Sequence, residues 1–273
     1  MLKEGVYVKI GASSSCFYPL ETEKAFLKIA ESGIRTSEIF LNSPSELNKS
    51  FVGELRKIKD TYGVDVRSLH PYRSFSEGYD IFSKYERRFE DVKDVFRRYF
   101  DAAGELGADF IILHGARGRA EIPPEKYAER YFELFRIAES MGCTLTHENV
   151  VDYVGAQPEF MSFMKSTLGD SFKMVLDIKQ ARRAGADYRK FIDVMGESIV
   201  HIHLSDCNDE RDCIPPSEKG LFDFRELFAL MQNVGYKGKY IVELYSDSFR
   251  DVGEIVSSTI YLQDILNGIE ERE

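Results

Sequence analysis

Four short apolar segments in the second half of the chain each end at a residue that can bind a metal ion. They read Leu145-Thr-His-Glu148, Met174-Val-Leu-Asp177, Val200-His-Ile-His203 and Tyr240-Ile-Val-Glu243. Each has the composition of a buried strand, and turn or helix signals separate it from the next. We therefore expect these last residues at the carboxyl ends of successive parallel strands.

In a closed βα barrel, the carboxyl ends of the strands form the rim on which active sites are built. Three carboxylates and one imidazole gathered there would repel one another and lose solvation unless a cation lay among them. An oxygen-rich set with one nitrogen donor favours Mn²⁺ or Mg²⁺, with Co²⁺ or Zn²⁺ as alternatives. We predict a single divalent metal ion, preferably Mn²⁺, bound by Glu148, Asp177, His203 and Glu243.

The alternation of side chains along a strand separates the neighbouring histidines. His147 is adjacent to Glu148 and is expected on the opposite side, packed between sheet and helices. His201 shares a face with His203 but lies deeper in the barrel, where we expect a hydrogen-bonded core histidine.

The whole chain alternates between predicted strands and helices. The other strands are expected at Val6–Ile10, which runs into a polar loop at Gly11–Ser15, and at Thr36–Leu41, Val64–His70 and Ala108–His114. Helices are expected at Glu21–Ser32, Ser45–Tyr62 with Ser45 as its N-cap, Arg87–Leu106, Pro124–Met141, Pro158–Leu168, Asp187–Met195, Asp223–Val234 and Val252–Ile269. This pattern predicts an α/β fold, a (β/α)8 TIM barrel, with residues 1–273 as one domain. An open doubly wound sheet is the alternative, but no GxGxxG follows the first strand and there is no Walker loop.

Length and composition agree with a single barrel enzyme. The chain has 273 residues and a formal net charge of -10, which argues against general affinity for nucleic acid or an anionic membrane. The N-terminus does not read as a signal peptide, and no apolar run is long enough to span a bilayer. Four cysteines without a CxxC pair suit a reducing compartment, so a cytoplasmic location is expected. A homo-oligomer is left open.

At these residues the chain resembles the xylose isomerase-like barrel superfamily. That group includes sugar-phosphate isomerases/epimerases, ketose 3-epimerases, inosose dehydratases and nucleases of the endonuclease IV type. The resemblance extends from the first strand to the last helix, and four segments carry it: THENV, VLDIKQARRAG, HIHLSD and YIVELY. It implies that Glu148, Asp177, His203 and Glu243 are metal ligands and that Glu148 and Glu243 are also the acid/base pair.

The resemblance also bears on substrate binding. Arg211 lies in a loop where such enzymes often place a substrate-binding arginine, and Gln180 stands where many relatives have a substrate-binding or metal-binding histidine. Gln180 can hydrogen-bond a hydroxyl group but is a poor metal ligand. His70 and His114, which end the third and fourth predicted strands, are either structural or serve in substrate contact or proton shuttling. Residues 207–216 contain no histidine, so the trinuclear zinc cluster of the nucleases looks incomplete.

These observations predict a metal-dependent sugar or sugar-phosphate isomerase/epimerase with a small carbohydrate as its substrate. The metal would stabilise an enediolate as a Lewis acid, while one glutamate removes a proton beside the carbonyl and the other returns it. An inosose-type dehydratase shares the first step and is an alternative. A metal-dependent phosphodiesterase of the endonuclease IV type and a non-catalytic sugar-binding barrel are less favoured alternatives.

Overall fold

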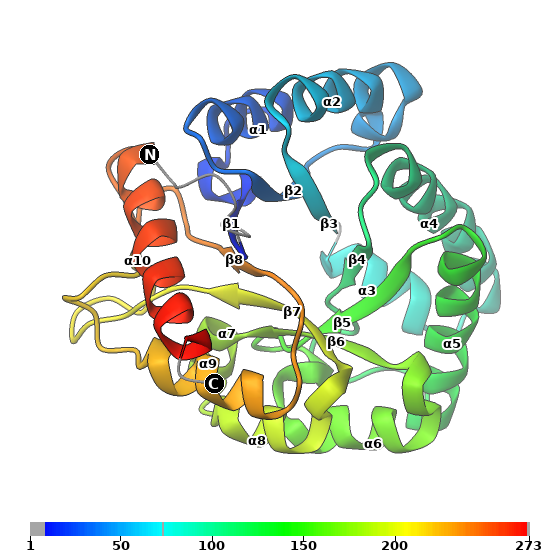
Figure 1. Cartoon of the computed structure of the whole chain (residues 1–273). Helices are drawn as coiled ribbons and strands as arrows, with labels where there is room; N and C mark the ends of the chain where they lie inside the picture. Colours follow the sequence, from blue (N-terminus) through cyan, green and yellow to red (C-terminus); the bar gives the residue numbers. More distant parts are fainter. Residues whose placement is uncertain (1–8, 73, 272–273) are drawn as a thin grey trace.

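Eight parallel strands close into a barrel in the order of the sequence, and the last strand pairs with the first. The structure is a computed structural model that describes residues 9–72 and 74–271. Figure 1 looks into the ring of strands and shows the helices arranged around its outside. The predicted (β/α)8 fold is confirmed.

The strands are short and almost entirely buried, as expected for parallel strands covered on both faces. They are β1 Ile10–Ser13, β2 Thr36–Leu41, β3 Asp65–Pro71, β4 Phe110–Leu113, β5 Thr144–Glu148, β6 Lys173–Asp177, β7 Ile199–Leu204 and β8 Tyr240–Val242. Buried apolar side chains from these strands and from the inner faces of the helices form one continuous core.

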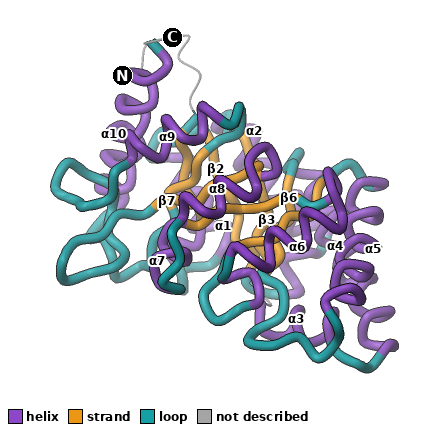
Figure 2. The backbone as a smooth tube through the Cα atoms, turned by 90° about the horizontal axis from the view of Figure 1, so that it is seen from below, coloured by secondary structure: helices purple, strands orange, loops and turns teal. Residues whose placement is uncertain are grey.

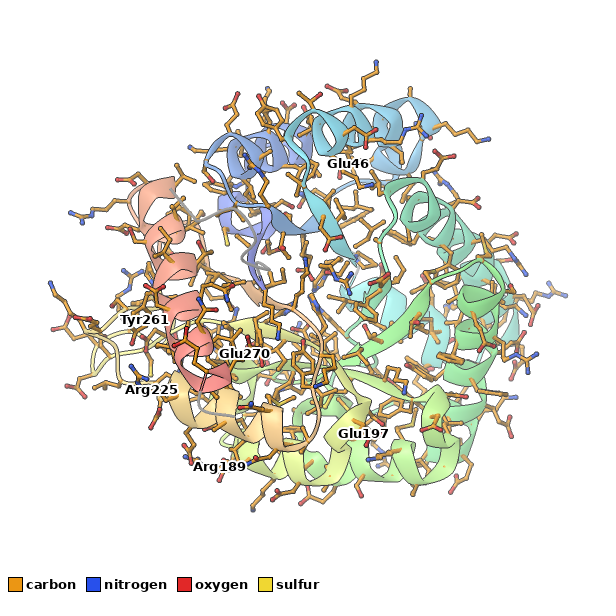
Figure 3. All side chains as sticks on the ribbon, in the orientation of Figure 1. Glu46, Arg189, Glu197, Arg225, Tyr261 and Glu270 are labelled. Atoms are coloured by element: carbon orange, nitrogen blue, oxygen red, sulfur yellow. The ribbon has the colours of Figure 1, made fainter. Side chains whose placement is uncertain are left out.

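The helices turn their apolar side to the barrel and their charged side outward; Arg189 on α8 is an example at the edge of Figure 3. They are α1 Thr22–Glu31, α2 Lys49–Tyr62, α3 Ser74–Phe82, α4 Glu86–Leu106, α5 Pro124–Ser140, α6 Pro158–Leu168, α7 Ile178–Arg183, α8 Tyr188–Met195, α9 Phe224–Asn233 and α10 Val252–Glu270. Among the described helices, none combines the length and apolar character needed to cross a membrane.

The first strand differs from the prediction. Most of the predicted strand Val6–Ile10 lies outside the described residues, and the predicted polar loop at Gly11–Ser15 is wrong because β1 continues to Ser13. Small side chains allow β1 to pack closely against β2. A Cβ atom added to Gly11 would lie 2.3 Å from the carbonyl oxygen of Thr36.

The helix predicted to begin at Ser45 begins later. Pro44–Leu47 form a 3₁₀ turn, and Asn48 has an extended backbone with φ -76° and ψ 142°, so α2 starts at Lys49. The helices α3 and α7 were not predicted from the sequence. Helix α7 has only six residues, too few for an apolar period to be seen.

The carboxyl ends of the strands face the end of the barrel that carries the long loops. Figure 2 shows these loops gathered on the same side as α7, which begins directly after β6. A register shift between Met174 and Val175 brings the last residue of β6, Asp177, level with His203 of β7. The shift therefore places two of the predicted ligands side by side at the rim.

We predict that Gly11→Ala destabilises the barrel by about 1–3 kcal/mol, because the added methyl group would collide with the β2 backbone. Gly53→Ala is the matched control: a Cβ atom there meets nothing within 4 Å in the middle of α2. This control should stabilise the protein by about 0.5–1 kcal/mol. Urea unfolding measures both free energies, and equal values for the two variants would contradict the close approach of β1 to β2.

Candidate active site

The four predicted ligands meet at the mouth of the barrel. Glu148 and Asp177 are the last residues of β5 and β6, His203 lies near the end of β7, and Glu243 directly follows β8. Each offers one donor atom, and these four atoms all lie within 4.8 Å of one another. The structure thus brings together residues that are separated by up to 95 positions in the sequence, as their strand-end positions require.

One nitrogen of His203 faces all three carboxylates. Its Nδ1 atom lies 3.0 Å from Glu148 Oε1, 3.7 Å from Glu243 Oε2 and 3.9 Å from Asp177 Oδ2. Asp177 Oδ2 is buried and accepts no hydrogen bond from any described residue. Burial, together with the charges of Glu243 and Glu148, raises the pKa of Asp177 to about 6, although Lys179 opposes the rise. This crowded, under-compensated donor set fits a divalent cation.

The other nitrogen of His203 contacts a carboxylate that the sequence analysis did not identify. His203 Nε2 lies 3.0 Å from Oε2 of Glu38, a fully buried residue in the middle of β2. Ser13 Oγ donates to Glu38 at 3.0 Å, and Ser68 Oγ donates at 2.7 Å. Burial opposes ionisation of Glu38, but His203 and His201 hold its pKa well below the usual range.

Glu38 and His203 form an arrangement that is common around protein metal sites. A carboxylate that accepts a hydrogen bond from the N–H group of one imidazole nitrogen fixes the tautomer and directs the other nitrogen to the metal. With Glu38 at Nε2, the Nδ1 atom of His203 faces the three carboxylates and could bind an ion held among them. A charged residue inside the apolar segment TSEIF was the available signal for this role, but its partner lies 165 positions away.

Two histidines surround the outer oxygen of Glu148. His114 Nε2 lies 2.9 Å from Glu148 Oε2, and His70 Nε2 lies 3.5 Å from the same atom. The Nε2 atoms of the two histidines are 2.9 Å apart. Together with Glu148, these histidines form a further group of possible metal ligands. Burial alone would lower the pKa of His70, but Glu148 and Glu38 raise it to about 9.

Lys179 is a second site residue that the sequence analysis missed. Its side chain is 2% exposed, and its Nζ atom lies 3.0 Å from Glu243 Oε2 and 3.5 Å from Asp177 Oδ2. The ammonium group also lies 4.8 Å from the centre of the Tyr245 ring. Burial opposes the charge, but Asp177 and Glu243 hold the pKa of Lys179 well above its usual value. Its place in the first turn of α7 follows from the strand end at Asp177.

Asn149 ties the ends of β5 and β6 together. Its Oδ1 atom accepts a hydrogen bond of 2.7 Å from the backbone N–H of Asp177, and its Nδ2 atom donates one of 2.9 Å to the Asp177 carbonyl. Asp177 Oδ1 in turn accepts from the backbone N–H of Gln180 at 2.9 Å and caps α7. These bonds fix Asp177 so that its other oxygen, Oδ2, faces Lys179 and His203.

A cavity of about 390 Å³ opens at the barrel mouth, and Glu148 and Glu243 line it. Its wall combines aromatic rings with hydroxyl, amide and charged groups, from Ser15, Tyr18, Phe40, Asn42, His70, Tyr72, His114, Glu148, Lys179, Gln180, Glu243, Leu244 and Tyr245. This volume and mixed lining suit a small polar ligand such as a sugar.

Three of the four predicted substrate-binding residues line this cavity: His70, His114 and Gln180. Arg211 does not line it. Its side chain is exposed, and its Nη2 atom donates to the carbonyl oxygen of Asp247 at 2.7 Å. A substrate contact from Arg211 stays a prediction.

The comparisons with known proteins agree with this geometry. Residues 26–265 match the family model of the xylose isomerase-like TIM barrel. The chain belongs to this family. Fructoselysine 3-epimerase of Escherichia coli O157:H7 is 22% identical over 249 residues, which cover 87% of this chain and 90% of the relative.

Solved structures of the same fold include a D-tagatose 3-epimerase-like protein. It has a TM-score of 0.75 and 21% identity, over 97% of this chain and 99% of that chain. The IOLI protein, which was solved with a bound zinc atom, has a TM-score of 0.75 and 16% identity, over 96% and 99% of the two chains. Members of this fold family that are named as sugar epimerases therefore match almost the entire barrel.

The remaining two histidines, His147 and His201, lie in the core, as the alternation of side chains along their strands predicted. His147 points away from the site, and its Nε2 atom lies 2.8 Å from the Tyr127 hydroxyl group. Burial lowers the pKa of His147 to about 4. His201 lies below His203 in the barrel, 3.2 Å from Glu38 Oε2 and 3.1 Å from Ser68 Oγ. Both expectations are confirmed.

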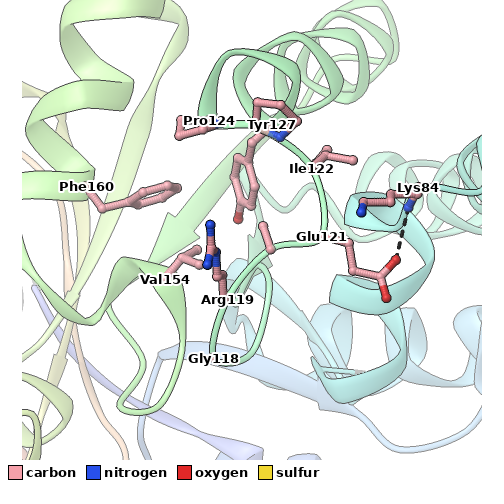
Figure 4. Close-up of a pocket in the computed structure, with 11 residues that line it drawn as sticks. Lys84, Gly118, Arg119, Glu121, Ile122, Pro124, Tyr127, Val154 and Phe160 are labelled. Atoms are coloured by element: carbon pink, nitrogen blue, oxygen red, sulfur yellow. Dashed lines mark hydrogen bonds between the residues drawn. The ribbon is translucent and has the colours of Figure 1, made fainter.

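A larger hollow of about 1130 Å³ lies beside the loop that precedes α5 (Figure 4). Charged groups from Lys84, Arg119 and Glu121 line it together with apolar side chains such as Phe160. Glu121 accepts a 3.1 Å hydrogen bond from the backbone N–H of Lys84, drawn dashed in Figure 4. The groups of possible metal ligands among the described residues lie at the barrel mouth and not in this hollow. The smaller cavity is therefore the candidate active site.

We predict that Glu38→Gln weakens the binding of Mn²⁺ by about 10–100-fold, because the carboxylate that orients His203 is lost. Titration calorimetry on the metal-free protein measures the change. Glu54→Gln, on the exposed surface of α2, is the control and should leave the affinity unaltered. Equal affinity of Glu38→Gln and the unmodified protein would show that Glu38 does not act on the metal ligand.

Proposed function

We propose that this protein is a divalent-metal-dependent sugar isomerase or epimerase. The observation that carries the proposal is the convergence of Glu148, Asp177, His203 and Glu243, two of which, Glu148 and Glu243, line a sugar-sized cavity with a mixed polar and aromatic wall. The names of the epimerases in the family support the same class of substrate.

We propose that these four residues hold one ion and that Mn²⁺ is the preferred one. The donor set has three carboxylates and one imidazole, which suits Mn²⁺ or Mg²⁺ and also admits Co²⁺ or Zn²⁺. When bound, such an ion supplies Lewis acidity that lowers the energy of a substrate enediolate.

Glu148 and Glu243 are proposed as the acid/base pair. Both carboxylates line the cavity, and they come from β5 and from the residue after β8, on different sides of the ring. One removes the proton from the carbon beside the substrate carbonyl group. The other delivers a proton to the opposite face of that carbon or to the neighbouring carbon, which gives an epimer or an aldose–ketose isomer.

The two glutamates have different partners, which suits different tasks. His70, His114 and His203 surround Glu148, whereas Lys179 contacts Glu243. The Glu243 side chain is 13% exposed, against 2% for Glu148, so Glu243 is the more open to a molecule in the cavity.

His70, His114 and Gln180 are proposed to position the substrate. They line the cavity next to the two glutamates, and imidazole and amide groups can donate to and accept from sugar hydroxyl groups. Gln180 Oε1 already accepts a 3.2 Å hydrogen bond from the backbone N–H of Val151, which leaves its amide protons to face the ligand.

The test is a screen of ketoses in D₂O with Mn²⁺-loaded protein. A true substrate is expected to acquire deuterium from solvent at the carbon beside its carbonyl group, because the proton passes through an exchangeable carboxyl group. Deuterium in a dehydrated product instead would indicate the inosose-type lyase reaction at the same site. No exchange with any ketose, isomerisable sugar phosphate or inosose would contradict the proposed reaction.

Replacing either glutamate by glutamine should lower turnover by about 10²–10⁴-fold, because the amide cannot accept the substrate proton. Ligand-induced thermal shifts should show that both Glu148→Gln and Glu243→Gln still bind the sugar. Glu159→Gln, on the exposed side of α6, provides the matched control and should turn over at the normal rate. Normal turnover in either active-site variant would remove that residue from the acid/base pair.

A further inference from the structure

Lys179 places a full positive charge inside the ring of carboxylates. Among the carboxylates at the barrel mouth, Glu243 and Asp177 are the two it reaches, through Oε2 at 3.0 Å and Oδ2 at 3.5 Å. These same oxygens are the ones that lie 3.7 Å and 3.9 Å from His203 Nδ1. The ammonium group therefore contacts atoms that a bound ion would use.

The surroundings of Lys179 hold its ammonium group in this position. The side chain is 2% exposed, so it is almost entirely shielded from solvent. The Tyr245 ring lies 4.8 Å from Nζ and offers a π face, while the hydroxyl group of Tyr245 is bonded to Arg183. A buried ammonium that serves only to fix a helix would not need to line the substrate cavity, as Lys179 does.

The net charge of the site explains what such a group does. The three carboxylates carry three negative charges, more than a divalent ion neutralises, and every excess charge opposes the formation of an anionic enediolate beside it. With Lys179 included, the charges of the three carboxylates, the ammonium group and a divalent ion sum to zero. The same ammonium group repels the ion, because two cations share the oxygens of Asp177 and Glu243.

We infer that Lys179 is a charge-balancing residue: its ammonium group weakens metal binding and favours the anionic intermediate. The effect of Lys179 on the anionic intermediate rests on the proposed function. The effect on metal binding depends only on the geometry of Lys179, Asp177 and Glu243.

The experiment compares Lys179→Met with Lys93→Met. Methionine keeps much of the length and apolar volume of the lysine stem but removes the charge. Lys93 is the matched control, since it is also largely buried and contacts two carboxylates, Glu90 and Glu133, on the outer helices. Competition with a chelator gives the dissociation constant for Mn²⁺ without any need for a substrate.

Lys179→Met is expected to bind Mn²⁺ about tenfold more tightly or better, because this change removes a like charge that contacts the same two carboxylates as the ion would. Lys93→Met should bind it as the unmodified protein does. A purely structural role would give the opposite sign, since loss of order at Asp177 and Glu243 would weaken binding. Unchanged or weaker binding in a folded Lys179→Met protein overturns the inference.

Two further variants serve as a replacement if Lys179→Met does not fold and as a control that keeps the positive charge. Lys179→Gln replaces Lys179→Met if the latter does not fold and should also tighten binding. Lys179→Arg keeps the charge and should hold the Mn²⁺ affinity within about threefold of the unmodified protein, since the repulsion remains. Tighter binding in Lys179→Arg equal to that in the neutral variants would contradict a role for charge.

Activity then separates the inference from the proposed function. With a ketose substrate identified, Lys179→Met should show kcat about 100-fold lower and KM within threefold, because the charge acts on the intermediate and not on the bound sugar. If Lys179→Met binds Mn²⁺ more tightly but the unmodified protein turns over no substrate, the inference about Lys179 is supported and the proposed reaction is contradicted. No metal binding by either protein would overturn both.

Discussion

The constraint on which the site depends is the confinement of three carboxylates at one buried point. Their donor atoms and that of His203 lie within 4.8 Å of one another. Such a cluster is unstable unless positive charge compensates it. The contacts around the mouth supply part of this compensation, with Lys179 beside Glu243 and His70, whose pKa is raised to about 9, beside Glu148. Asp177 Oδ2 is buried and accepts no hydrogen bond from any described residue, so a bound cation would complete the contacts of this oxygen.

The barrel makes this confinement possible because each group is carried by a different strand end. The register shift in the β6–β7 pair sets Asp177 level with His203, and Asn149 joins the end of β5 to the end of β6. Closure of β8 onto β1 brings Glu243 back to the same mouth. Below this layer, Glu38 contacts both His203 and His201, so the imidazole of His203 is held from inside the barrel. The barrel mouth thus has an outer layer of cavity-lining side chains, a middle layer with the four proposed ligands and a supporting layer of hydrogen bonds.

Much of this could be predicted from the sequence because strand ends are local features. An apolar run that stops at Glu148 or Asp177 marks both the strand and the position of the side chain on the rim. Glu38 and Lys179 could not be placed in this way. Glu38 lies mid-strand, and its role depends on a partner 165 positions away. Lys179 lies in a six-residue helix, and its role depends on a carboxylate 64 positions away. Gly11–Ser13 were misassigned to a loop because small polar residues resemble a turn, although here they allow close strand packing.

The central claim is that the four residues at the mouth hold a divalent ion. Elemental mass spectrometry on protein loaded with Mn²⁺ and then desalted tests it most directly, with Asp177→Asn as the comparison because this change removes one charge and one donor without altering side-chain size. We predict about one ion per chain in the unmodified protein and little in the variant. An unmodified protein that retains no ion after loading, or a variant that retains as much as the unmodified protein, would contradict the account.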